Sequence, residues 1–122
     1  MSYFVRNQQF AFGIDLSRYN ASADLTQTPD FDQIAAHNPA VNFIAIRAGV
    51  SWGYRDPMFK PFFQGAQAIG ACVLPYHVLY PGEPALKQVN SFLKILEGIN
   101  LDEVRLVLDV ELEHEQTRAV IT

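Results

Sequence analysis

Residues 106–112 have the sequence Leu-Val-Leu-Asp-Val-Glu-Leu, which alternates between two kinds of side chain. A period of two is typical of a β-strand with one apolar face and one polar face. The leucine side is expected to be buried, so that Asp109 and Glu111 lie side by side on the other face. Because a strand rises ~3.3 Å per residue, their Cα atoms should lie roughly 6.5 Å apart. Like charges that close disfavour joint ionisation, so one carboxyl is expected to stay protonated near neutral pH.

A protonated carboxyl beside an ionised one is the pair that hydrolysis of a glycosidic bond requires. Asp109 and Glu111 are therefore candidate catalytic residues. The alternative interpretation is an exposed edge strand whose acidic face is simply solvated. Two carboxylates in an apolar barrel interior would cost several kcal/mol unless they were paired or hydrated, which favours the functional interpretation.

Apolar segments alternate with helical patterns along the chain at intervals of about thirty residues, the length of one strand, one helix and two short loops. The predicted strands are Phe10–Leu16, Asn42–Gly49, Ala71–Leu79 and Arg105–Leu112. The predicted helices are Phe31–His37, Met58–Ile69 and Ala85–Leu96, with start signals at Asp30, Asp56-Pro57 and Pro84 and glycine stops at Gly70 and Gly98. Strands that alternate with helices imply parallel pairing and right-handed crossovers.

Two α/β architectures fit this alternation: an open doubly wound sheet and a closed barrel of the triosephosphate isomerase type. Central strands of an open sheet tend to be apolar throughout. Here each strand instead turns polar, at Asp15, Arg47, His77 and Asp109. Barrel enzymes take their chemistry from the carboxyl ends of several strands, so the pattern favours the barrel. Residues 13–17 lack the glycines of a phosphate-binding loop, which disfavours a nucleotide site.

An eight-stranded barrel typically takes about 250 residues, whereas this chain has 122. The predicted fold is therefore the N-terminal half of a barrel, with about four parallel strands alternating with helices. We expect residues 1–122 to form a single, incomplete catalytic domain. The segment Glu115–Thr122 is predicted to open a fourth helix.

Composition narrows the class of protein further. The chain is 49% hydrophobic and 18% charged, as in globular proteins, and its net charge of −4 offers no basic cluster for nucleic acid. The sequence contains no apolar run of the ~18 residues needed to span a bilayer, and no secretory signal is evident in the first dozen residues. The single cysteine, Cys72, lies in an apolar run and is expected to be a buried thiol.

Four short motifs together resemble glycoside hydrolase family 25, the lysozyme-like muramidases. They are Gly-Ile-Asp-Leu-Ser at 13–17, Phe-Ile-Ala-Ile-Arg-Ala-Gly at 43–49, Pro-Tyr-His at 75–77 and Leu-Asp-Val-Glu at 108–111. The resemblance extends from about Phe12 to Thr122, with the motifs in the family's order. One departure is Val78, which follows the Tyr-His pair where the family usually has an aromatic residue.

The resemblance implies cleavage of the β-1,4 bond between N-acetylmuramic acid and N-acetylglucosamine in peptidoglycan, without a metal or other cofactor. Glu111 matches the family's general acid, Asp109 its partner carboxylate and Asp15 the aspartate of the first strand. A further family aspartate would lie beyond Thr122. The implied partner is the peptidoglycan glycan strand, with neither nucleic acid nor membrane. The implied protein acts outside the cell or at the cell wall and is a monomer when full length.

Four other residues are candidates for substrate binding: Arg47, Tyr76, His77 and Trp52. Each also has a structural interpretation. Arg47 is equally suited to an ion pair with the acids, and Trp52 to anchoring its loop. Tyr76 and His77 point to opposite faces of their strand, so at most one faces the site; a lone histidine in an apolar strand is more often a hydrogen-bonded core residue.

Two other functions stay open from the sequence. Asp15, His77, Asp109 and Glu111 offer donors for a divalent metal in a metal-dependent barrel hydrolase, although the chain lacks the paired histidines that a zinc site usually supplies. A non-catalytic chain that only holds glycan is the third hypothesis.

Overall fold

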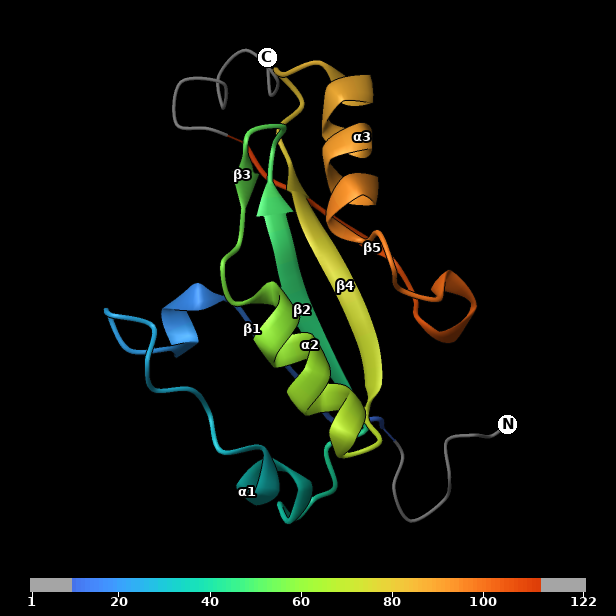
Figure 1. Ribbon diagram of the computed structural model, residues 1–122. Helices are drawn as coiled ribbons and strands as arrows, with labels where there is room; N and C mark the ends of the chain where they lie inside the picture. Colours follow the sequence, from blue (N-terminus) through green and yellow to red (C-terminus); the bar gives the residue numbers. More distant parts are fainter. Residues whose placement is uncertain (1–9, 113–122) are drawn as a thin grey trace.

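The computed structural model describes residues 10–112, which form one mixed sheet with helices packed against it (Figure 1). The parallel strands β1 (Gly13–Leu16), β2 (Phe43–Val50), β4 (Cys72–Leu79) and β5 (Val107–Val110) lie in the order β1-β2-β4-β5. A two-residue strand, β3 (Tyr54–Arg55), pairs antiparallel with the end of β2. The helices are α1 (Phe31–Ala35), α2 (Phe59–Ala68) and α3 (Ala85–Ile95), with 3-10 turns η1 (Arg18–Asn20) and η2 (Leu101–Glu103).

This arrangement confirms the predicted alternation of parallel strands with helices. The four predicted strands and the three predicted helices that fall within the described residues are present, and their observed bounds lie within a few residues of the predicted ones. The hairpin that forms β3 was not expected, because a two-residue strand leaves no periodic signal in the sequence. The predicted helix Glu115–Thr122 lies outside the described residues.

Short-range signals explain where the helices begin and end. The Asp30 carboxylate caps α1 by accepting hydrogen bonds from the backbone N–H groups of Asp32 and Gln33, at 3.0 and 3.1 Å. Gly70 and Gly98 follow α2 and α3 with φ of 77° and 88°. Only glycine adopts this left-handed conformation without steric cost, so both residues stop their helices as the sequence predicted.

The hydrophobic core lies between the sheet and the helices α2 and α3, on what we call the helix-covered face of the sheet (Figure 1). Every second residue of β2 points into it, and Ile44, Ile46 and Ala48 have no exposed surface. The helices contribute one side each to this core: Phe59, Phe62, Phe63 and Ala66 from α2, and Phe92 and Ile95 from α3. Burial of these large side chains provides the main stabilisation, since each contributes roughly 1.5–3 kcal/mol.

The alternate residues of the same strands point to the opposite face of the sheet, which we call the open face. Phe43, Ala45 and Arg47 of β2 are partly exposed there. Cys72 begins β4 on this face and is exposed, so the expectation of a buried thiol was wrong. Its apolar neighbours face the helices, but a period of two places Cys72 opposite them.

The leucine side of β5 is also not buried in the described part of the chain. Leu108 and Val110 are 50% and 61% exposed. Among residues 10–112, β5 pairs with β4 alone, and none of its residues belongs to the hydrophobic core cluster or packs against it. The predicted burial of this side was wrong for these residues, although the predicted strand and its alternation are confirmed.

Within the described range, no helix combines the length and the apolar character needed to cross a bilayer.

Gln88 of α3 ties its helix to the end of β4. Its side chain accepts a hydrogen bond from the Tyr80 N–H at 2.8 Å and donates to the carbonyls of Tyr80 and Glu83 at 2.9 and 3.1 Å. The residue is 1% exposed, so water does not replace these bonds easily.

We expect Gln88→Ala to lower the free energy of unfolding by roughly 2–4 kcal/mol, because it leaves buried backbone groups without partners. Urea denaturation measures the change. Asn90→Ala, at an exposed position of the same helix, is the matched control and should stay within about 0.5 kcal/mol of the parent. Equal losses for the two variants would show that the Gln88 bonds do not stabilise the β4–α3 connection.

Candidate active site

A cavity of about 340 Å³ lies on the open face of the sheet. All four parallel strands contribute to its lining, which consists of Asp15, Ala45, Tyr76, Val107, Leu108 and Asp109. Two of the predicted catalytic residues, Asp15 and Asp109, therefore share one cavity although 94 positions separate them in the sequence. Tyr76, a predicted substrate-binding residue, lies between them.

Strand register explains how these residues meet. Asp15 is paired with Ala45, Tyr76 with Val107, and Val78 with Asp109. Paired residues of neighbouring strands project to the same face of a sheet. This register therefore puts the side chains of Asp15, Tyr76 and Asp109 on the open face. The core on the helix-covered face holds the register, because a one-residue slip would turn its apolar side chains outward.

Asp109 and Glu111 lie close enough to interact directly. A hydrogen bond with the Asp109 carboxylate is the main cause that raises the pKa of Glu111 above its usual value. Partial burial and the negative charge of Asp109 raise this pKa further, whereas the positive charge of Arg47 lowers it. Glu111 therefore keeps its proton to higher pH than an ordinary glutamate does.

Tyr76 presents a neutral hydroxyl to the cavity. Burial raises the pKa of its phenol, and the negative charges of Asp15 and Asp109 act in the same direction, against a smaller opposing effect of Arg47. A tyrosine that stays protonated can donate a hydrogen bond to a ligand oxygen.

His77 lies on the helix-covered face and does not reach the cavity. It has no exposed surface, its Nε2 is hydrogen-bonded to the Ser51 carbonyl, and its ring stacks on Phe92 with centroids 5.0 Å apart. Burial lowers the pKa of its imidazole, so the ring is neutral at physiological pH. The opposite orientations of Tyr76 and His77 were predicted, and of the two only Tyr76 lines the cavity.

Arg47 forms its ion pair with Asp56 and not with Asp109 or Glu111. Its Nε donates to Asp56 Oδ2 at 2.9 Å. Its guanidinium carbon lies 5.4 Å from the centroid of the Tyr19 ring and 5.5 Å from that of Tyr54. These contacts hold the cation at the carboxyl end of β2, within electrostatic range of Glu111.

Trp52 lines a different groove, outside the carboxylate cavity. This groove of about 350 Å³ is formed with Lys87, Asn90, Ser91 and Lys94 of α3. The Lys87 ammonium lies 4.6 Å from the centroid of the Trp52 ring, a cation–π contact. Trp52 is 49% exposed, so its loop position leaves part of the indole open to a ligand.

The sequence interpretation missed Asp56 and Tyr19, which both contact Arg47. The Asp56-Pro57 pair predicted only a helix start, and the Asp56 carboxylate does accept the Met58 N–H at 2.9 Å. The Asp56 carboxylate also accepts hydrogen bonds from the Arg18 N–H and the Arg47 Nε–H, which belong to other elements of the fold. A fixed spacing does not encode contacts of this kind, so no sequence signal announced them.

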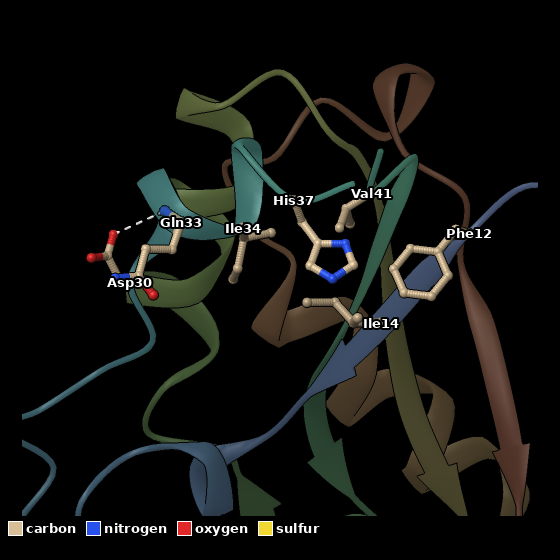
Figure 2. A pocket seen from close by; sticks show the side chains of 7 residues that line it. All are labelled: Phe12, Ile14, Asp30, Gln33, Ile34, His37 and Val41. Carbon is tan, nitrogen blue, oxygen red and sulfur yellow. Dashed lines mark hydrogen bonds between the residues drawn. The ribbon is translucent and has the colours of Figure 1, made fainter. Parts of the chain in front are cut away.

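A second cavity, of about 320 Å³, lies between α1 and β1 (Figure 2). Its acid, Asp30, is occupied as the cap of α1, and its histidine, His37, stacks on Phe12 with centroids 5.5 Å apart. Most of the remaining lining is aliphatic: Ile14, Ile34 and Val41. This cavity has no pair of carboxyl groups of the kind that hydrolysis of a glycosidic bond requires.

Residues 10–112 contain no group of three or more His, Cys, Asp and Glu side chains arranged to hold a metal ion. The position of His77 explains why the four-residue donor set considered from the sequence does not assemble, since this ring lies on the other face from Asp15 and Asp109.

Comparisons with known proteins give the family to which the chain belongs and two solved structures with a similar fold. The model of the glycosyl hydrolases family 25 matches residues 14–122. Among solved structures, a muramidase from Acremonium alcalophilum matches with a TM-score of 0.64 and 22% identity, over 84% of this chain and 45% of that chain. A muramidase from Trichobolus zukalii matches with a TM-score of 0.56 and 25% identity, over the same shares of the two chains. No curated protein matches the sequence significantly.

These matches confirm the predicted fold, an α/β arrangement that corresponds to the N-terminal half of a barrel. The chain spans less than half the length of each of these two muramidases.

We expect Asp109→Asn to lower the pKa of Glu111, because the variant removes the negative charge that favours the protonated form. The ¹³C shift of the Glu111 carboxyl carbon, followed by NMR against pH, gives the midpoint directly. Asp102→Asn, at an exposed position of η2, is the control and should leave that midpoint unchanged. An unchanged or higher midpoint in Asp109→Asn would contradict the direct coupling of the two carboxyls.

Proposed function

Because the chain belongs to glycosyl hydrolases family 25, we propose that it is the catalytic part of a peptidoglycan hydrolase. The bond cleaved is the β-1,4 linkage between N-acetylmuramic acid and N-acetylglucosamine. The observation that carries the proposal is the Asp109–Glu111 pair beside the open-face cavity, with the pKa of Glu111 raised by its partner. The two muramidase neighbours support the substrate class.

Glu111 is the general acid of the proposed reaction. Cleavage of a glycosidic bond requires a proton on the leaving oxygen, and the donor must still carry its proton at the working pH. The neighbouring Asp109 carboxylate favours the protonated form of Glu111. The proton therefore moves from the Glu111 carboxyl to the leaving sugar oxygen as the bond to the anomeric carbon breaks.

Asp109 then stabilises the positive charge that develops at the anomeric carbon. Because the cleaved sugar carries a 2-acetamido group, the oxygen of that group is an internal nucleophile for the same carbon. In that case Asp109 or Asp15 orients the acetamido N–H, and Glu111 afterwards removes a proton from the attacking water. Both routes use the same three carboxyl groups, and Asp15 and Asp109 line one cavity.

The substrate-binding roles follow from position. Tyr76 lies in the cavity and offers its hydroxyl to the sugar, and Arg47 lies beside the carboxylates. The separate groove that contains Trp52 would hold a more distant part of the glycan. His77 supports the site indirectly, through its bond with the Ser51 carbonyl in the loop after β2.

Peptidoglycan lies outside the cell membrane, so the proposed protein acts at the cell wall or in the extracellular space. The site needs no cofactor for this reaction, since both the proton and the stabilising charge come from carboxyl groups.

We expect Glu111→Gln, in the protein that carries this chain, to lower the rate of reducing-end release from peptidoglycan at least about a hundredfold, the usual contribution of a general acid. The amide has almost the same shape but cannot donate an acidic proton. Glu103→Gln, exposed on η2, is the matched control and should keep the parental rate. Retention of more than a few per cent of activity by Glu111→Gln would remove Glu111 from the acid role.

We expect activity to survive prolonged dialysis against a strong chelator, because carboxylate acid catalysis involves no metal. The measurement is the rate of reducing-end release before and after dialysis, together with binding to insoluble peptidoglycan. Loss of activity that is restored by a divalent metal would favour the metal-dependent hydrolase. Binding without any release of reducing ends would favour a protein that only holds glycan.

A further inference from the structure

Asp56 is a buried carboxylate that accepts hydrogen bonds from three separate residues. The residue is 2% exposed and stands between β3 and α2. Its Oδ1 accepts the Met58 N–H at 2.9 Å, a short-range bond in the turn that precedes α2. Its Oδ2 accepts the Arg18 N–H at 3.0 Å and the Arg47 Nε–H at 2.9 Å. The carboxylate therefore joins η1, β2 and the start of α2, three elements that are distant in sequence.

The Arg47 guanidinium is held on several sides by this arrangement. Asp56 binds its Nε, and the rings of Tyr19 and Tyr54 lie 5.4 and 5.5 Å from its central carbon. Only 13% of the Arg47 side chain is exposed. A long side chain loses much conformational entropy when it is fixed, so several favourable contacts are needed to keep it in one place.

Strand register directs this cation towards the carboxyl pair. Arg47 is paired with Tyr76, and Tyr76 with Val107, so the three side chains form one row across the open face. Asp109 lies two residues further along β5, on the same face, in the next row of side chains. Rows on one face are roughly 6.6 Å apart, so a residue as long as arginine reaches the neighbouring row.

We propose that Asp56 is a positioning residue for the acid chemistry of the site: it fixes Arg47 beside the Asp109–Glu111 pair and balances its charge. The chemical role of this balance rests on the proposed function, but the electrostatic effect does not. An unpaired guanidinium near two carboxyls would favour the ionised form of both and would remove the proton that a general acid needs. A guanidinium paired with Asp56 keeps its place, and the negative charge of Asp56 partly offsets its field at Glu111.

Among residues 10–112, few charged or titratable groups lie around the network formed by Asp56, Arg47, Asp109 and Glu111. Glu111 faces Asp109 and, at longer range, Arg47. Arg47 faces Asp56, Tyr54 and Tyr76. Among the described residues, the network is also approached by Asp15, which acts on Tyr76, and by Arg18, whose guanidinium carbon lies 5.7 Å from the Tyr19 ring centroid.

The test uses two substitutions with opposite expected effects on the midpoint of Glu111. Asp56→Asn leaves the charge of Arg47 without its counterion, so the Glu111 midpoint should fall. Arg47→Gln removes the cation and leaves the Asp56 charge, so the midpoint should rise. The double variant restores the charge balance and should return the midpoint towards the parental value. The ¹³C shift of the Glu111 carboxyl carbon measures each midpoint and does not depend on turnover.

Thermal unfolding of each variant separates positioning from simple stabilisation. A purely structural Asp56 would lower the melting temperature without moving the Glu111 midpoint, and that result overturns the proposal. If Asp56→Asn does not fold, Arg47→Gln and the charge-conserving Arg47→Lys decide the question. A higher midpoint in Arg47→Gln together with a near-parental one in Arg47→Lys is expected, and equal midpoints in the two overturn the proposal.

The pH profile of kcat/KM on peptidoglycan links the network to catalysis. Its basic limb reports loss of the proton from the general acid, so it should move to lower pH in Asp56→Asn and to higher pH in Arg47→Gln. NMR midpoints that shift as expected in a protein without hydrolytic activity would contradict the proposed function and leave the electrostatic role of Asp56 intact. Limbs that stay fixed while the NMR midpoints move would overturn the link between Asp56 and catalysis.

Discussion

The two faces of the parallel sheet are linked by the alternation of side chains along each strand. Ile44, Ile46 and Ala48 are fully buried against the helices, and this packing fixes how β2 is rotated and where it pairs. Because neighbouring side chains point to opposite faces, the same constraint decides that Arg47 faces the open side. The stabilising face of the sheet therefore sets the geometry of the face that carries the chemistry.

The open face gathers charges that would be unfavourable in a closed apolar core. The hydrogen bond with Asp109 and the negative charge of Asp109 both favour the protonated form of Glu111, so the pKa of Glu111 is raised. Arg47 is placed close enough to act on this pair, but its own counterion is Asp56. A site built in this way favours the protonated form of Glu111, and a general-acid mechanism needs a protonated donor.

Several sequence predictions depended on local patterns, and these agree with the structure. Asp30 caps α1, Gly70 and Gly98 end their helices, and the alternation around Asp109 marks a strand. The expectations of burial for Cys72 and for the leucine side of β5 were wrong, because burial depends on what covers a face. An apolar run indicates that its residues can be buried, but burial also requires a layer of side chains packed over them.

The sequence by itself determined that α1, α2 and α3 form, that β1, β2, β4 and β5 run parallel, and that Asp109 and Glu111 lie on one side of their strand. Each of these follows from spacing along the chain, which a single sequence contains in full. Only the tertiary structure decided that Asp56 is the counterion of Arg47, that Tyr19 and Tyr54 flank the guanidinium, and that His77 packs against Phe92. These contacts join separate elements, and their partners are chosen by packing in three dimensions, which no periodicity in the chain records.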